Sequence, residues 1–141
     1  MSLEDNKALV RNFLEKANRE RGTPVEMCAP GAAFRIGGTP AMSLQAFQQF
    51  QAAYFAAFPD SSIAIEDMLA EGDRVAFRGV VTATHTAQFM GTPASGKPIA
   101  VPVIGIARLA EGKIAEWWNS ADRLSWMQQI GALPRSDKTT P

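Results

Sequence analysis

The chain has 141 residues, of which 46% are hydrophobic and 20% are charged, a composition typical of one globular domain and not of a disordered chain. Fourteen basic residues balance fourteen acidic ones, so no positive field favours nucleic acid or an anionic membrane as a partner. No run approaches the roughly 18 apolar residues of a membrane-spanning helix. Cys28 is the one cysteine, and the acidic N-terminal segment lacks the features of a signal peptide. Both observations predict a cytoplasmic protein.

The first 60 residues predict two long helices. Apolar side chains recur at helical spacing over residues 3–20, after Ser2 as a cap and before Gly22. Residues 24–30 predict a short helical turn, and residues 32–38 a short strand. A second helix begins at Ser43 and stops at Pro59, and one of its sides carries the aromatic residues Phe47, Phe50, Tyr54, Phe55 and Phe58.

After Pro59 the apolar period changes from 3.6 to 2. The β-rich runs are residues 61–69, 73–89, 97–109 and 113–121, and glycine-containing turns separate them. Residues 122–130 predict a last helix, and residues 135–141 a flexible tail. Helices followed by a strand meander predict a single α+β domain over residues 1–134, in which helices pack on one face of a curved antiparallel sheet.

The run over residues 97–109 is apolar on both of its alternating faces. Ile99, Val101 and Val103 lie on one face, and Ala100, Ile104 and Ile106 lie on the other. A sheet with one solvated face normally alternates apolar and polar residues. We therefore expect helices on one face and a second copy of the chain on the other, which makes a homodimer. Pro102 cannot donate to a ladder and predicts a bulge or an irregular stretch at its position.

Few residues are available for metal or nucleophile chemistry. His85 is the one histidine and Cys28 the one cysteine, so this chain cannot assemble a structural zinc site or a His-rich catalytic metal site by itself. Nucleotide-binding glycine motifs and a nucleophile elbow are also missing from the sequence. We therefore expect no metal and no cofactor, and either acid/base chemistry or ligand binding without chemistry.

Two segments resemble the SnoaL-like polyketide cyclase family. One is "AYFAAFPDSSIAIEDMLAEGDRVAFRGVVTATHTAQFMGTPASGKPI", which is similar to that family's F-P-D, E-G-D-r-V-a-x-R and G-T-H-t-G-x-f-x-G-x-P patterns. The other is "ARLAEGKIAEWWNSADRLSWMQQIGALP", which is similar to its G-K-I-x-E-x-W-x-x-x-D segment. Together they cover about residues 53–134, and the N-terminal helix fits as well. Each motif alone is weak, but the ordered set is specific.

The resemblance implies the nuclear transport factor 2-like fold, a cone of curved sheet and helices around one apolar pocket. It also implies ring closure of a polycyclic ester by intramolecular aldol condensation, without metal or cofactor, with an aspartate as acid/base. By motif position this aspartate is Asp122. On this basis we favour the interpretation that the chain is an enzyme, which acts on an apolar or aromatic carbonyl compound in an enclosed pocket.

Residue patterns alone allow two roles for Asp122. Alternation places Glu116, Trp118, Ser120 and Asp122 on one side of the last strand, so an apolar environment would raise the carboxyl pKa towards that of a general base. The same residue begins the last helix, and Asp is among the preferred N-caps. The two roles are compatible with each other.

The predicted substrate-binding residues are His85, Trp118, Ser120, Phe34 and Phe89. His85 could donate a hydrogen bond to a substrate carbonyl or tie down a turn. Ser120 stands where the resemblance implies a histidine beside the catalytic aspartate, and "VIGIARL" lacks the expected glutamine and histidine. Arg78 fits the family pattern, but a strand arginine is usually an ion-pair or rim residue, and we interpret it as such.

Other readings stay open. A non-catalytic binding or accessory protein of the same fold would explain the missing histidine and glutamine. A ketosteroid-isomerase-like reaction needs a tyrosine donor, and Tyr54 is the one tyrosine. An epoxide-hydrolase-like reaction needs an Asp-Arg-Asp set, to which Arg78 and Asp122 could contribute.

Overall fold

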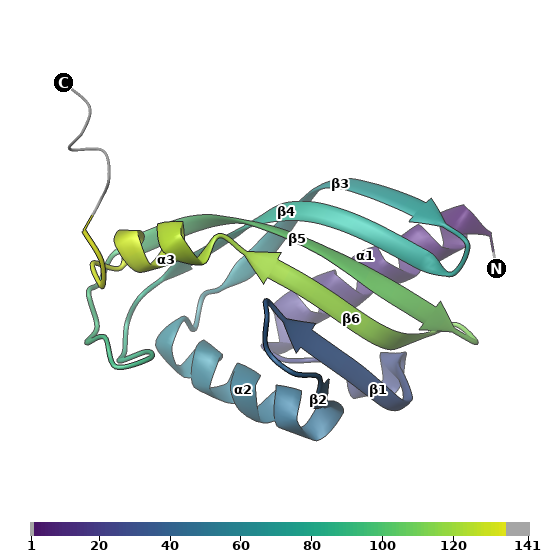
Figure 1. The fold of residues 1–141 in the computed structure, drawn as a ribbon, viewed down its shortest axis with the longest axis horizontal. Coiled ribbons are helices and arrows are strands. Elements are labelled where there is room, and N and C mark those ends of the chain that lie inside the picture. The colour runs from purple at the N-terminus through teal and green to yellow at the C-terminus, as the bar shows by residue number, and fades with distance from the viewer. Residues whose placement is uncertain (1, 135–141) are drawn as a thin grey trace.

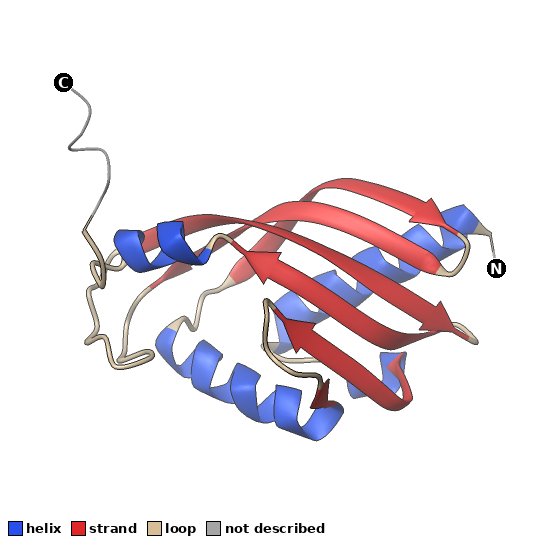
Figure 2. Ribbon diagram, in the orientation of Figure 1, coloured by secondary structure: helices blue, strands red, loops and turns tan. Residues whose placement is uncertain are grey.

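The computed structural model describes residues 2–134 and contains three α-helices beside one six-stranded sheet (Figures 1 and 2). The predicted tail, residues 135–141, lies outside the described residues. In chain order the elements are α1 (Leu3–Glu20), the 3-10 turn η1 (Val25–Met27), β1 (Cys28–Ile36), β2 (Met42–Ser43), α2 (Leu44–Ala57), β3 (Ser62–Glu71), β4 (Arg74–Thr84), β5 (Pro98–Ala110), β6 (Lys113–Ala121) and α3 (Arg123–Gln129). This architecture confirms the predicted α+β class.

Both long helices begin at the predicted caps. Ser2 and Asp5 form a capping box at α1, in which the Asp5 amide donates to Ser2 Oγ at 3.0 Å. Ser43 Oγ accepts from the Ala46 amide at the start of α2. In Figure 1, α1 crosses behind the strands and α2 lies below β1 and β2. No helix within residues 2–134 is long and apolar enough to cross a membrane.

The sheet order is β2-β1-β6-β5-β4-β3. The meander from β3 to β6 is antiparallel, as predicted, whereas β1 pairs with β6 in parallel. The fully antiparallel sheet that the sequence predicts is therefore corrected to a mixed one. Parallel pairing requires a long crossover, and α2 with the meander supplies it because both lie between β1 and β6 in the chain.

The second meander strand is shorter than predicted. β4 ends at Thr84, and residues 85–97 form a loop that is closed at its base by His85 N–H to the Lys97 carbonyl and Gly96 N–H to the His85 carbonyl. Met90 and Gly91 both have positive φ, which reverses the chain at the loop tip. The sequence prediction extends this strand too far because the alternating pattern typical of a strand continues after Thr84.

Pro102 does not cause the predicted bulge. It pairs in register with Val80 of β4, and its carbonyl accepts from the Asp122 amide at 3.1 Å. The N–H and the carbonyl of one strand residue point towards the same neighbouring strand, so the N–H that Pro102 lacks would face β6. The pairing of β5 with β6 begins only at the next residue, Val103, opposite Ala121. Proline is tolerated there because no ladder donor is required, so the prediction of a bulge or an irregular stretch at Pro102 is wrong.

All three helices pack on one face of the sheet, which we call the inner face. One buried cluster joins α1 and α2 to the centre of the sheet, through side chains that include Phe13, Phe34, Phe47, Phe77 and Trp117. A second cluster lies where α2 ends and α3 begins to pack, and it includes Phe58, Ile99, Val101 and Ile130. On the opposite, outer face, no described helix covers the strands.

Candidate functional site

Asp122 is the N-cap of α3. Its Oδ1 accepts from the Ser125 amide at 3.0 Å, and its carbonyl accepts from the Trp126 amide. This confirms the capping role, which contributes on the order of 1 kcal/mol to stability. The side chain is exposed, so the apolar surroundings that the sequence predicts for it are not those observed.

Trp118 and Ser120 lie on the outer face. They line a shallow hollow of about 480 Å³ together with side chains from three neighbouring strands, which include Leu69, Ala76, Arg78, Ile104 and Ile106. Trp118 is paired with Ile106 of β5, and Ser120 with Ile104. Paired residues of antiparallel strands project to the same side of a sheet, so this hollow faces away from all three helices.

Phe34, His85 and Phe89 belong to the inner side. Phe34 is fully buried and stacks on Phe47 of α2, with ring centroids 4.5 Å apart. His85 is fully buried and stacks on Phe58 at 5.2 Å. The five predicted substrate-binding residues are thus divided between two faces of one sheet, because the sheet separates Trp118 and Ser120 from the other three.

A cluster of aromatic side chains lies on the inner face of the sheet, at the end of the molecule where α3 packs. Phe58 contacts Tyr54 at 5.0 Å, Phe89 at 5.1 Å and Trp126 at 5.6 Å between ring centroids. Burial raises the pKa of Tyr54 to about 12, and its hydroxyl lies 2.6 Å from Ser61 Oγ. Tyr54 is therefore a neutral phenol at physiological pH. The sequence places Tyr54 and Phe58 on the aromatic side of the second helix and predicts Phe89 as substrate-binding, and Trp126 is the member that it did not single out.

Asn119 is an inward polar residue that the sequence analysis missed. It is the cross-strand partner of Gly105, where an added Cβ would come within 2.4 Å of the buried Phe77 ring, so this pair projects to the inner face. Its Oδ1 is buried and has no hydrogen-bond partner among the described residues. Alternation from Trp117 contains this signal, but the sequence does not tell which tryptophan points inward.

Charged residues of the outer face are paired within the chain. Arg78 Nη1 donates to Glu66 Oε1 at 2.8 Å, which confirms the ion-pair reading of this arginine. Glu116 accepts from Arg108 Nε at 2.6 Å and Arg35 Nη1 at 3.0 Å, and these hydrogen bonds, chiefly that from Arg108, lower the pKa of its carboxyl. These contacts are structural, since each charge already has its partner.

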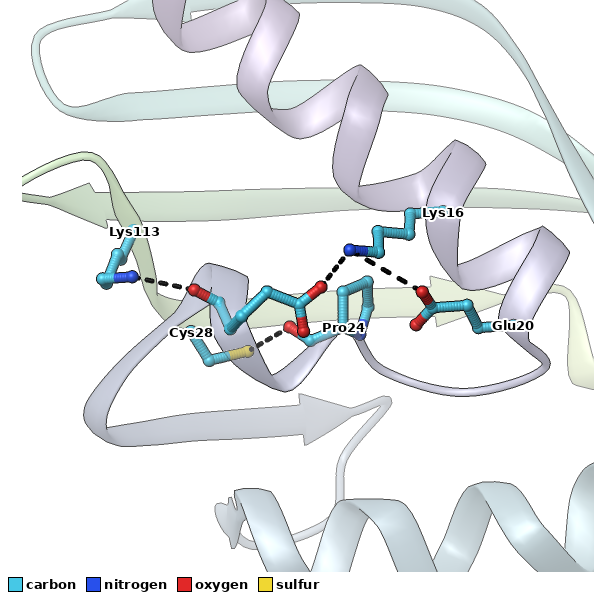
Figure 3. Close-up of polar contacts among 6 residues, drawn as sticks. Lys16, Glu20, Pro24, Cys28 and Lys113 are labelled. Carbon is cyan, nitrogen blue, oxygen red and sulfur yellow. Dashed lines mark hydrogen bonds and ion pairs between the residues drawn. The ribbon is translucent and has the colours of Figure 1, made fainter.

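Cys28 also has a structural role and not a reactive one. Its thiol donates to the Pro24 carbonyl at 3.6 Å, and burial raises its pKa to about 11 (Figure 3). Beside it, Lys16 contacts the carboxylates of Glu20 and Glu26, and Lys113 donates to the Glu26 carbonyl. A thiol with a raised pKa is a poor nucleophile at neutral pH, so this cluster joins α1, η1 and β6 and offers no reactive group.

The curved sheet, its one helix-covered face and the aromatic end define a small α+β protein of the nuclear transport factor 2-like fold. The family model for SnoaL-like polyketide cyclases matches residues 8–130, so the chain belongs to that family. No curated protein matches the chain.

Three solved structures illustrate the likeness. AclR, a proposed hydroxylase from Streptomyces galilaeus, has 27% identity and a TM-score of 0.85, covering 94% of this chain and all of AclR. A proposed SnoaL-like polyketide cyclase from Jannaschia sp. CCS1 has 25% identity and a TM-score of 0.82, with 93% of this chain and 94% of that one covered. IdmH, a proposed polyketide cyclase from Streptomyces antibioticus, has 25% identity and a TM-score of 0.79, with 89% and 98% covered.

Proposed function

We propose that the chain is a cofactor-free polyketide (ester) cyclase that closes a ring by an intramolecular aldol-type step on an apolar or aromatic carbonyl compound. The observation that carries this proposal is the family match over residues 8–130. The aromatic cluster around Phe58 supports the substrate class, because flat rings favour stacking against aromatic side chains.

In the proposed reaction Asp122 is the general base. Its carboxylate takes a proton from the carbon between two carbonyls, the resulting enolate forms the carbon–carbon bond, and the new alkoxide recovers the proton. Oδ1 is engaged by the Ser125 amide, whereas Oδ2 has no hydrogen-bond partner within residues 2–134. One oxygen can thus hold the carboxylate in place while the other receives the proton.

The first test is Asp122→Asn, because asparagine keeps the capping oxygen and removes the base. We predict that turnover of a panel of aromatic β-keto esters, followed by chromatography of the cyclised product, falls about 100-fold or more. The melting temperature should change little. Asp73→Asn, at an exposed turn carboxylate, is the matched control and should keep full activity. Full activity in Asp122→Asn would show that another group is the base.

A non-catalytic ligand-binding or accessory protein is the second candidate. Two observations favour it: Asp122 is exposed, and the inward polar group of β6 is the amide of Asn119 rather than a carboxylate. Calorimetric binding of a cyclised product with no turnover of any linear ester, in the wild-type chain, would select this candidate over the enzyme.

We also infer that a second copy of the chain covers the outer face, as the sequence predicts. Leu69, Ile104 and Ile106 line the hollow and are 69%, 62% and 41% exposed, although large apolar side chains are normally covered. The charges around them are paired within the chain, so two identical faces meet without net repulsion. A two-fold interface places such a face against itself.

A cytoplasmic location is likewise a proposal, supported by the lone, buried Cys28.

A further inference from the structure

The side chain of Gln129 joins α3 to the sheet through hydrogen bonds that resemble those of a paired strand. Its Oε1 accepts from the Ala100 amide at 2.7 Å, and its Nε2 donates to the Ala100 carbonyl at 3.0 Å. The same Nε2 donates to Ser125 Oγ at 2.8 Å, one turn earlier in α3. One side-chain amide therefore pairs with both backbone groups of Ala100 and is held in place from within the helix.

Ala100 lies where β5 has no neighbouring strand on one side. β6 ends at Ala121, so the first residues of β5 extend past it. Because the backbone groups of a strand alternate in direction, those of Pro98, Ala100 and Pro102 point towards the β6 side. Proline has no N–H, so Ala100 supplies the one amide donor of this stretch, and Gln129 accepts it. An open strand edge is a site for pairing with another chain, and α3 closes this one.

The beginning of α3 is attached to the same strand edge. The Asp122 amide donates to the Pro102 carbonyl at 3.1 Å, two residues along β5 from Ala100. α3 has only seven residues, and a helix of this length is not stable by itself in water. Its place directly after β6 (Figure 1) therefore depends on the rest of the chain. The contacts that hold it are these two polar attachments and the packing of Trp126 and Ile130 in the second buried cluster.

We propose that Gln129 is a positioning residue, which fixes α3 on β5 and thereby fixes Asp122, the general base of the proposed reaction. Asp122 is the N-cap of α3, so its carboxylate lies where the beginning of the helix places it. A displacement of about 1 Å in a reacting group lowers a rate substantially. The inference rests on the proposed function for the role of Asp122, whereas the attachment of α3 is measured without turnover.

The hydrogen bonds of Gln129 lie beside solvent, so a carboxyl group introduced at this position can change its protonation with pH. A surface hollow of about 450 Å³ is lined by Gln129, Ala100, Lys97, Pro98, Ser125 and Gln128, and Lys97 is its one charged residue. A carboxylate in place of the amide accepts from the Ala100 N–H but repels the Ala100 carbonyl oxygen. A neutral carboxyl group can accept from the first and donate to the second, as the amide does.

The test compares Gln129→Glu with Gln128→Glu, its matched control. Both place a carboxyl group in the last turn of α3, but the hydrogen bond that Gln128 donates goes to the Pro134 carbonyl and not to the sheet. At pH 7 we expect Gln129→Glu to speed hydrogen exchange at the Trp126 amide, which bonds the Asp122 carbonyl within α3, about 3- to 10-fold. The control should change it less than about 2-fold. At about pH 4, below the ordinary glutamate pKa of about 4.3, exchange in Gln129→Glu should return towards the wild-type rate at that pH.

Turnover of an aromatic β-keto ester gives the second readout. At pH 7 the kcat of Gln129→Glu should be about 3- to 10-fold below that of the wild type, and the ratio should recover at about pH 4 together with the exchange rate. A chain that is merely destabilised would not recover on acidification. Equal exchange in the two variants, no recovery at about pH 4, or an unchanged kcat would overturn the proposal. Absent turnover in the wild-type chain would instead contradict the proposed function, and exchange would still decide whether Gln129 holds α3.

Discussion

Glu116 is the residue whose protonation has the clearest consequence for stability. Hydrogen bonds from Arg108 and Arg35 hold its pKa below the ordinary glutamate value of 4.5. Because the pKa is lower in the folded than in the unfolded chain, the ionised carboxylate stabilises the fold above about pH 4.5, and this contribution is lost as the pH falls through the folded-state value.

We predict that Glu116→Gln lowers the free energy of unfolding by up to about 1 kcal/mol at neutral pH, since the pair is partly exposed. Below the folded-state pKa the variant and the wild type should be equally stable. Urea denaturation at neutral pH and at a pH below the folded-state pKa measures this difference in the free energy of unfolding. Glu15→Gln, which has no ion pair among the described residues, is the control, and an equal loss at both pH values would contradict the electrostatic explanation.

At the scale of elements, β5 depends on a glycine that leaves room for the Phe77 side chain of the neighbouring strand β4. A Cβ on Gly105 would lie 2.4 Å from the Phe77 ring and 2.5 Å from the Trp118 carbonyl oxygen. We predict that Gly105→Ala destabilises the fold by about 1–3 kcal/mol through overpacking. Thermal and urea unfolding measure the loss. Gly38→Ala, where an added Cβ meets nothing within 4 Å, should change stability by less than about 0.5 kcal/mol; similar losses in both variants would argue against the packing cause.

At the scale of the whole molecule, the sheet presents one covered and one bare face. If a second copy covers the bare face, Ile104→Lys should convert a dimer into a monomer, because it places a charge opposite its own copy in an apolar interface. Light scattering after size exclusion measures the mass. Val25→Lys replaces a similarly exposed side chain away from the hollow and should stay dimeric. A monomeric wild-type chain at about the micromolar concentrations typical of association studies would remove the proposal.

Prediction from sequence succeeded where the signal was local. The bounds of α1 and the Ser43 cap of α2 follow from spacing and capping chemistry, which depend on residues within one or two turns. It was less accurate for β4, whose alternating pattern continues past Thr84 into the loop, and for β1, whose parallel partner lies far along the chain. Pairing across many residues leaves no local pattern.

The candidate site shows the same division. The sequence by itself determined the family, the α+β class and the aromatic side of α2, because these depend on residue identity and short-range spacing, and it offered capping as one of two roles for Asp122. Only the tertiary structure decided that Trp118 faces outward, that Asn119 faces inward and that His85 and Trp126 contact the same ring. The physical reason is that alternation defines two faces of a strand, whereas the helices that pack on the sheet decide which face is inside.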